Sequence, residues 1–508
     1  MFNFNAKQNH ILHLSWFAFF LSFVAWFNMA PFNTTLVRLA GLSQEQVNIL
    51  MLSNVALTIP ARILIGIWVD YFGPRKVFSS LLLFSAGVCF YFASGKTFEE
   101  VLIARLLMGI VGAGFVVGIK MIADWFPPNK MGIAQGIYAG WGNFGAAAAA
   151  FSLPIVAIYF PEETGWRVAV ILNGILCIIW SAIYFFFAKE NSQNGGNFII
   201  GLEHCIEVTS RRDILLQILL LIPLYGAVAI LVWKLSGHPL PLLSTNTSKI
   251  LYAGILFLFT YNVIHLLRLN LPKLVGSIPP EKQYEFKQIV ILSMVYALTF
   301  GSQLAVISMF PQFLETTFDL SVTTAGIVGS SFAVLNLVSR PAGGWVADLI
   351  EKKRSLVLFV LGSMIGYTIM GEIDTSWPLW SVLLSAFSCS FFLQAGTGAC
   401  FAAVPLIRKD LTGQMAGIAG ALADDGEKRR LEIDLSPLCP FDRGDVLRGR
   451  LGYSGGLLRR DHDLAGRRLR SEVAEDDVTL VTDCFAYALQ VLEHDRFTGV
   501  DWNDRNVG

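Results

Sequence analysis

Long apolar segments separated by short polar turns run through most of the 508-residue chain. Six lie within the first 188 residues and four more follow residue 286, and each is long enough to cross a membrane as a helix, which needs about 20 apolar residues. We expect these ten spans at residues 11–32, 46–69, 77–94, 101–124, 131–159, 167–188, 288–310, 322–347, 355–371 and 378–406. The pattern predicts an all-α polytopic membrane protein.

Residues 189–285 separate the two groups of spans. The polar stretch 189–212 is typical of a loop, and two apolar stretches follow at 214–233 and 250–267. We interpret these two stretches as an extra hairpin of spans, which returns the chain to the side from which it came. Helices that lie in the membrane interface are the alternative.

Basic residues in the short turns predict the orientation of the chain. Arg75 and Lys76 follow the second span, Lys130 lies between the fourth and fifth, and Lys189 follows the sixth. Because cytoplasmic turns carry an excess of Lys and Arg, these turns and the N-terminus are predicted to be cytoplasmic. We therefore expect a multi-pass protein of the plasma membrane.

Composition narrows the classes of function. With 54% hydrophobic residues and a formal net charge of zero, the chain is too apolar for a soluble protein, so its partner is the lipid bilayer and not nucleic acid. The seven cysteines include no C-x-x-C pair, and neither an H-E-x-x-H motif nor a Walker loop is present. We predict no enzymatic activity, no metal and no cofactor. The sequence does not indicate an oligomeric state.

An arginine, a glycine and an aspartate recur at four-residue spacing, once in each group of spans. They are Arg62, Gly66 and Asp70 and, 278 residues later, Arg340, Gly344 and Asp348. Each set shares one helix face, with its arginine roughly 12 Å along the axis from its aspartate. Each arginine is then expected near the middle of the membrane, where a charge is costly and marks a functional site. Snorkelling to the headgroups is the alternative.

A second repeat surrounds the fifth span. Glycines at four-residue spacing, including Gly136 and Gly140, are echoed around Gly417, and such glycines allow two helices to approach closely. Asn143, about 18 Å into the same span, can donate its amide to an anion or hydrogen-bond a neighbouring helix. The echo stops at Asp424, where a second asparagine is expected.

The repeats divide the chain into four parts. A six-helix bundle at 1–188 is followed by the central segment 189–285, a second bundle at 286–421 and a charged tail at 422–508. The tail is charged at 31 of 87 positions, against 45 of the preceding 421. We interpret it as a foreign or frame-shifted stretch that replaces the last two helices, with a genuine cytosolic extension as the alternative. The second half is therefore predicted to be incomplete.

These motifs resemble the major facilitator superfamily and, within it, the nitrate/nitrite porters. Gly66-x3-Asp70-x2-Gly73-x-Arg75 is similar to the superfamily's loop signature. The stretch 139–145, Ala-Gly-Trp-Gly-Asn-Phe-Gly, resembles the nitrate signature of the fifth helix, and 296–302 resembles the pocket motif of the seventh. The resemblance implies two six-helix halves that rock around a central site.

The resemblance also implies the residues of that site. Arg62 and Arg340 match the paired arginines that clamp nitrate, with Asn143, Tyr296 and Phe300 beside them. Physical chemistry favours the same substrate class, because two facing guanidiniums repel unless a small planar anion neutralises them. The aromatic rings of Tyr296 and Phe300, one turn apart, would form an aromatic wall.

Energy coupling and alternative functions stay open. Asp124, Glu315 and Asp319 lie near span ends, so a carboxylate proton relay is not expected, and nitrate enters either with a proton by another route or in exchange for nitrite. Transport of another small organic anion and a membrane sensor that signals through the tail are alternative functions. A transport-defective member of the nitrate porters is a further one.

Overall fold

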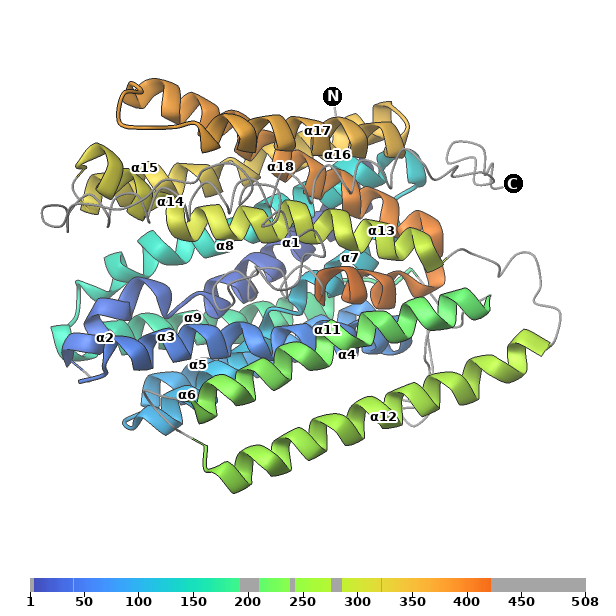
Figure 1. The fold of residues 1–508 in the computed structure, drawn as a ribbon, viewed down its shortest axis with the longest axis horizontal. Coiled ribbons are helices and arrows are strands. Elements are labelled where there is room, and N and C mark those ends of the chain that lie inside the picture. Colours follow the sequence, from blue (N-terminus) through green and yellow to red (C-terminus); the bar gives the residue numbers. More distant parts are fainter. Residues whose placement is uncertain are drawn as a thin grey trace, which may run out of the picture.

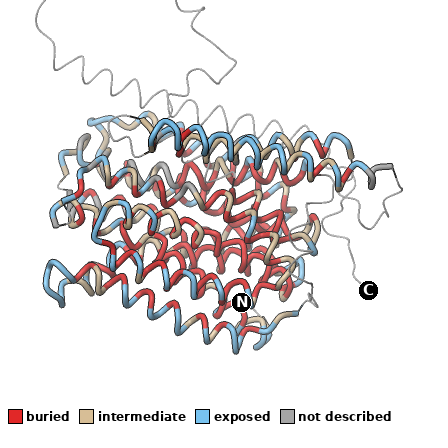
Figure 2. The backbone as a smooth tube through the Cα atoms, turned by 90° about the horizontal axis from the view of Figure 1, so that it is seen from below, coloured by how far each residue is buried: buried red, intermediate tan, exposed pale blue. Residues whose placement is uncertain are grey.

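The computed structural model describes residues 4–39, 41–191, 210–237, 243–275, 286–320 and 322–421. These residues form helices and turns, and most helices run side by side along the long axis of the molecule (Figure 1). Buried positions gather on the inward faces of the helices, and exposed positions line the periphery (Figure 2). The predicted all-α architecture is confirmed.

The first group of spans contains four uninterrupted long helices and several shorter elements. The long helices are α1 (Ala6–Trp26), α5 (Pro74–Ser94), α8 (Met131–Ala157) and α9 (Glu162–Phe187). The shorter elements are η1 (Ala30–Phe32), α2 (Asn33–Leu39), α3 (Gln44–Ala56), α4 (Thr58–Phe72), α6 (Phe98–Val111), α7 (Gly114–Trp125) and η2 (Pro128–Lys130).

The second group is built in the same way. Its elements are α13 (Phe286–Tyr296), the π-helical turn η4 (Ala297–Gly301), α14 (Ser302–Phe318), α15 (Val322–Val334), α16 (Asn336–Leu349), α17 (Lys352–Gly371), α18 (Leu379–Ile407) and η5 (Lys409–Leu411). A further helical stretch covers residues 412–421. The tail that we predicted to be foreign lies outside the described residues.

Seven helical segments of the described chain are long and apolar enough to cross a membrane. They are Ala6–Phe32, Pro74–Ser94, Phe98–Trp125, Glu162–Phe187, Thr245–Leu271, Lys352–Gly371 and Leu379–Ile407. Their number and hydropathy agree with a multi-pass membrane protein.

Four spans that we expected to be continuous are interrupted. The second span breaks between α3 and α4, where Pro60 has no N–H to bond the carbonyl of Ala56. The fourth breaks between α6 and α7 at Gly112, whose added Cβ would lie within 3.0 Å of both Trp26 and Thr58. Residues 288–310 contain the π-helical turn, and 322–347 divide into α15 and α16. Hydropathy alone does not register such breaks, because a hydropathy window averages over the residues on both sides of a break.

The interruptions obey the same repeat as the motifs. Adding 278 to the limits of α3 (44 and 56) gives 322 and 334, which are the limits of α15, and adding it to the start of α4 (58) gives the start of α16 (336). Each arginine helix therefore begins four residues before its arginine. The internal duplication extends from sequence to backbone conformation.

Glycines bring the two halves into backbone contact. A Cβ added to Gly136 of α8 would lie 2.5 Å from the carbonyl oxygen of Arg340 in α16. In the symmetry-related place, a Cβ added to Gly417 would lie 2.5 Å from the carbonyl oxygen of Arg62 in α4. Each arginine helix therefore packs tightly against a glycine-rich helix of the other half.

The central segment contributes α11 (Arg211–Ser236) and α12 (Thr245–Val275). Both helices run alongside the bundle, and α12 lies at its periphery (Figure 1). Leu221 and Tyr225 of α11 pack against Ile59 of α4 and Ala421, so this helix contacts both halves. The division of the chain into domains stays a prediction.

Candidate functional site

Arg340 lies in the centre of the molecule, where its guanidinium donates hydrogen bonds to neutral acceptors. Its side chain is fully buried; Nε donates to Oδ1 of Asn336 at 2.8 Å, and Nη2 donates to Oε1 of Gln303 at 3.3 Å. The hydroxyl of Tyr296 also interacts with this guanidinium. Its Nη1 is buried and has no hydrogen-bond partner among the described residues. A buried guanidinium with an unsatisfied N–H is expected to attract an anionic ligand.

Arg62 occupies the symmetry-related position in α4 and is also fully buried. Its Nη1 donates to the carbonyl oxygen of Gly420 at 2.7 Å, so it contacts a residue of the other half directly. The guanidinium of Arg62 is close enough to that of Arg340 for the two charges to interact. The structure therefore brings the two predicted arginines to one place.

A stack of three aromatic rings connects the two arginines. Phe115 and Tyr296 stack with centroids 6.1 Å apart, and Tyr296 stacks on Phe300 at 5.1 Å, each pair within 5° of parallel. The Cζ of Arg62 lies 5.9 Å from the centroid of Phe115, and that of Arg340 lies 5.3 Å from the centroid of Phe300. These distances are within the range of cation–π contacts. The stack gives the centre a flat, apolar wall that crosses from one half to the other.

Phe115, Gln303 and Asn336 were missed by the sequence analysis. Phe115 lies one residue into α7, inside an apolar run in which one phenylalanine looks like any other. Asn336 carried a usable signal, because it stands four residues before Arg340 and so shares its helix face. Gln303 follows directly on the motif 296–302, where its polar side chain in an apolar span was also visible.

Asn143, which we predicted to bind the anion, bonds within its own helix. Its Nδ2 donates to the carbonyl oxygen of Ala139 at 2.7 Å, and the residue is 9% exposed. It lies three residues beyond Gly140, whose added Cβ would be 3.3 Å from Cβ of Arg340. The asparagine is therefore near the arginine helix, and its contact with substrate stays a prediction.

The two repeated aspartates lie at one end of the bundle, where each caps a helix of the opposite half. Asp348 accepts from the backbone N–H groups of Gly132 and Ile133 at 2.9 and 2.8 Å, at the start of α8. Asp70 accepts at the same distances from Gly413 and Gln414. A carboxylate at a helix N-terminus is favoured by the unpaired N–H groups and the helix dipole. These four bonds hold the halves together at this end, which we call the aspartate end.

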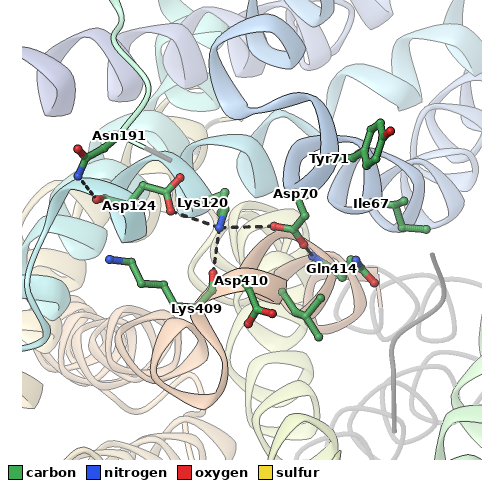
Figure 3. A pocket seen from close by; sticks show the side chains of 10 residues that line it. Ile67, Asp70, Tyr71, Lys120, Asp124, Asn191, Lys409, Asp410 and Gln414 are labelled. Atoms are coloured by element: carbon green, nitrogen blue, oxygen red, sulfur yellow. Dashed lines mark hydrogen bonds and ion pairs between the residues drawn. The ribbon is translucent and has the colours of Figure 1, made fainter. Parts of the chain in front are cut away.

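Lysines complete the charge balance at the aspartate end. Nζ of Lys120 is 3.2 Å from Asp124 and 3.9 Å from Asp70, and it donates to the carbonyl oxygen of Lys409 at 2.9 Å (Figure 3). These residues line a cavity of about 630 Å³ together with Asp410. Lys352 similarly lies 3.3 Å from Asp348. Asp124 was expected near a span end, whereas Lys120 was not predicted from the sequence to be part of a site.

Two further motif residues shape the turn between α4 and α5. Gly73 has φ = 84°, a positive value that glycine adopts without strain. The Glu190 carboxylate lies against this glycine and accepts the backbone N–H of Arg75 at 3.2 Å. The Arg75 guanidinium lies over the ring of Phe185 at 5.4 Å. The motif turn thus contacts the segment that follows α9.

Comparison with protein families agrees with this architecture. The model of the Major Facilitator Superfamily matches residues 15–424. The chain belongs to this superfamily. The match ends three residues beyond 421, close to the point where the glycine echo stops.

Several members of the superfamily are similar to this chain. The nitrate/nitrite transporter NrtP of Picosynechococcus sp. is 39% identical over 460 residues, covering 85% of this chain and 86% of the relative. The high-affinity nitrate transporter 2.3 of Oryza sativa subsp. japonica is 24% identical, covering 83% of this chain and 70% of the relative. The predicted family resemblance is confirmed.

Solved structures show the same fold at low sequence identity. The proton:xylose symporter XylE is 14% identical with a TM-score of 0.59, covering 96% of this chain and 95% of that one. The human organic anion transporter MFSD10 has a TM-score of 0.57 at 12% identity, covering 96% of this chain and all of that one. At these identities the likeness concerns the fold alone.

Proposed function

We propose that the chain is a secondary transporter that moves nitrate and nitrite across the membrane by alternating access. The observation that carries the proposal is the buried Arg340 guanidinium, which has neutral acceptors, lies near Arg62 and has an Nη1 without a hydrogen-bond partner among the described residues. The named function of relatives at 39% identity supports the same substrates. Enzymatic activity is no part of the proposal.

The chemistry of the centre suits a small planar anion. A guanidinium is planar and can donate two parallel N–H groups to two oxygens of one ion, as nitrate offers. The stacked Phe115, Tyr296 and Phe300 limit the space on one side and exclude water, which strengthens each charge-assisted bond. Asn143 is proposed as an additional amide donor once the anion is bound.

The contacts between the halves support the proposal of alternating access. Separation at the aspartate end requires the four capping bonds of Asp70 and Asp348 to break, while α8 and α16 slide along their glycine contact. We propose that this end is cytoplasmic, as is the N-terminus, in the plasma membrane, because the basic turns lie there. The structure is then the state closed to the cytoplasm.

The experiment is uptake of ¹⁵N-nitrate into liposomes that contain the purified full-length chain. We expect uptake that unlabelled nitrite and nitrate inhibit and that chloride and sulfate do not. Arg340→Gln should abolish it, whereas Arg354→Gln, which changes an exposed arginine, should not. Absence of uptake by folded wild-type protein, both with internal nitrite and with an inward proton gradient, would overturn the proposal.

The same liposomes separate the two modes of coupling and the alternative substrate. Uptake driven by internal nitrite without a pH gradient indicates exchange, and uptake that needs an inward proton gradient indicates proton cotransport. Stronger inhibition by formate or acetate than by nitrite would instead favour the small organic anion.

A further inference from the structure

We infer that Gln303 is a positioning residue that fixes the guanidinium of Arg340 and leaves its positive charge for the anion. The inference rests on the proposed function and names a determinant of that same site. Gln303 is 2% exposed and is the second residue of α14, directly after the π-helical turn. Its Oε1 accepts from Nη2 of Arg340 at 3.3 Å across two different helices.

Two bonds from different helices define how the guanidinium lies. Asn336, one turn earlier in α16, holds Nε, and Gln303 of α14 holds Nη2. Because the guanidinium is planar, two bonds at different nitrogens fix its plane. The third nitrogen, Nη1, is buried without a hydrogen-bond partner in the described chain, so its N–H groups are available to a ligand. Gln303 therefore contributes to orienting the free donors.

The amide of Gln303 accepts a hydrogen bond without cancelling the charge that it orients. A carboxylate of the same size would form a buried ion pair with Arg340, and an incoming anion would then have to compete with it. The ionisable groups that act on Arg340 among the described residues are Arg62 and Tyr296. Neither type of side chain normally titrates between pH 5 and 8. Anion binding by the native site is therefore expected to vary little with pH.

Replacing Gln303 tests this role directly. Nitrate affinity is measured by titration calorimetry on the purified full-length protein, at pH 5 to 8, for wild type, Gln303→Glu and Gln303→Met. We expect Gln303→Glu to bind about 100-fold more weakly at pH 8 and to recover affinity as the pH falls, because binding then requires protonation of the introduced carboxylate. Gln303→Met removes the acceptor alone, so we expect about a 10-fold loss at every pH.

Gln135→Glu is the matched control for a buried carboxylate. Gln135 is fully buried in α8, and its Nε2 donates to the carbonyl oxygen of Ile119. This variant should bind nitrate with a pH dependence like that of wild type. A pH-dependent loss in Gln135→Glu as large as in Gln303→Glu would show that any buried acid has the effect and would overturn the inference.

Two other outcomes would also overturn it. Folded Gln303→Glu that binds nitrate as wild type does at pH 8 would show that the charge at this position is irrelevant. A folded wild-type protein that binds neither nitrate nor nitrite would refute the proposed function, and the role of Gln303 with it. Wild-type binding together with an insensitive Gln303→Glu variant would refute the role of Gln303 alone.

Discussion

Arg340 and Asp348 lie two turns apart in α16. Arg340 is fully buried and Asp348 is partly buried, but the two charges have different kinds of partner. Asp348 accepts two backbone N–H groups at the start of α8 and lies 3.3 Å from the ammonium of Lys352. Arg340 donates to the neutral amides of Asn336 and Gln303, and no partner for its Nη1 is found in the part of the chain that the structure describes.

The difference separates a structural contact from a ligand site on a single helix. At the aspartate end, the protein supplies both partners of the interaction, so the contact closes the molecule without a ligand. In the centre, the protein supplies the cation and orients it, and the neutralising charge is expected to come from outside. Substitutions on α16 and its neighbours test this difference.

Arg340→Lys should have the largest effect. Lysine keeps the charge and loses the planar fork, so it cannot hold the anion through paired hydrogen bonds. We expect nitrate uptake into liposomes to fall about 100-fold or more, because at least two charge-assisted hydrogen bonds are lost. Arg354→Lys is the control, because that side chain is exposed and pairs with nearby Glu351. Retained high-affinity uptake by Arg340→Lys would show that paired hydrogen bonds from Arg340 are not needed to hold the anion.

Gly136→Leu should have the next largest effect, because it changes the helix contact that positions Arg340. An added Cβ would lie 2.5 Å from the Arg340 carbonyl oxygen, so the helices α8 and α16 must separate. Overpacking of this kind costs roughly 1–3 kcal/mol, and we expect a lower thermal midpoint and at least about 10-fold slower uptake. Gly87→Leu is the matched control, since no neighbouring atom of the described residues lies within 4 Å of a Cβ added at Gly87. Equal effects of the two substitutions would contradict the packing role.

Asp348→Asn should loosen the aspartate end and leave the centre intact. Asparagine has no charge to interact with the α8 N-terminus and Lys352. That interaction is worth about 1–2 kcal/mol, so the closed state should become about 10-fold less populated. Maleimide labelling of a cysteine introduced at Leu411, which lines the cavity at this end, should accelerate accordingly. Asp374→Asn, in the loop before α18, should leave the labelling rate unchanged.

Phe115→Leu should have the smallest effect of the four. It removes the ring that lies 5.9 Å from Cζ of Arg62 and that stacks on Tyr296, but it keeps an apolar side chain of similar size. Loss of a desolvated cation–π contact predicts about a 3- to 10-fold increase in the nitrate concentration for half-maximal uptake. Phe84→Leu, on the outer face of α5, should behave as wild type.

Much of the fold could be predicted because the chain repeats itself. The spacing from Arg62 to Asp70 and its recurrence 278 residues later predicted two related bundles, and the helix limits follow the same offset. The breaks within four spans could not be read from hydropathy, which averages over both sides of a break. The fourth span breaks at Gly112, which packs tightly against Trp26 and Thr58, and such tertiary contacts cannot be read from the sequence.

The charged residues of the site could be predicted from the sequence, and the residues around them less well. A buried arginine stands out in an apolar span, so Arg62 and Arg340 were found from sequence. Phe115 reaches the centre only because α7 packs against the other half, and the chain contains 39 phenylalanines. Asn143 was expected to face the anion, but an asparagine inside a helix can equally bond its own backbone, as it does here.

The most direct test is the thermal stability of the purified full-length protein with nitrate, nitrite, chloride or sulfate, for wild type and Arg340→Gln. A ligand that binds only the folded state raises the midpoint by mass action, whether or not transport is measured. We expect nitrate and nitrite to raise the midpoint of wild type and to leave that of Arg340→Gln unchanged. Equal stabilisation of wild type by all four anions, or nitrate stabilisation that survives in Arg340→Gln, would contradict a central anion site built on Arg340.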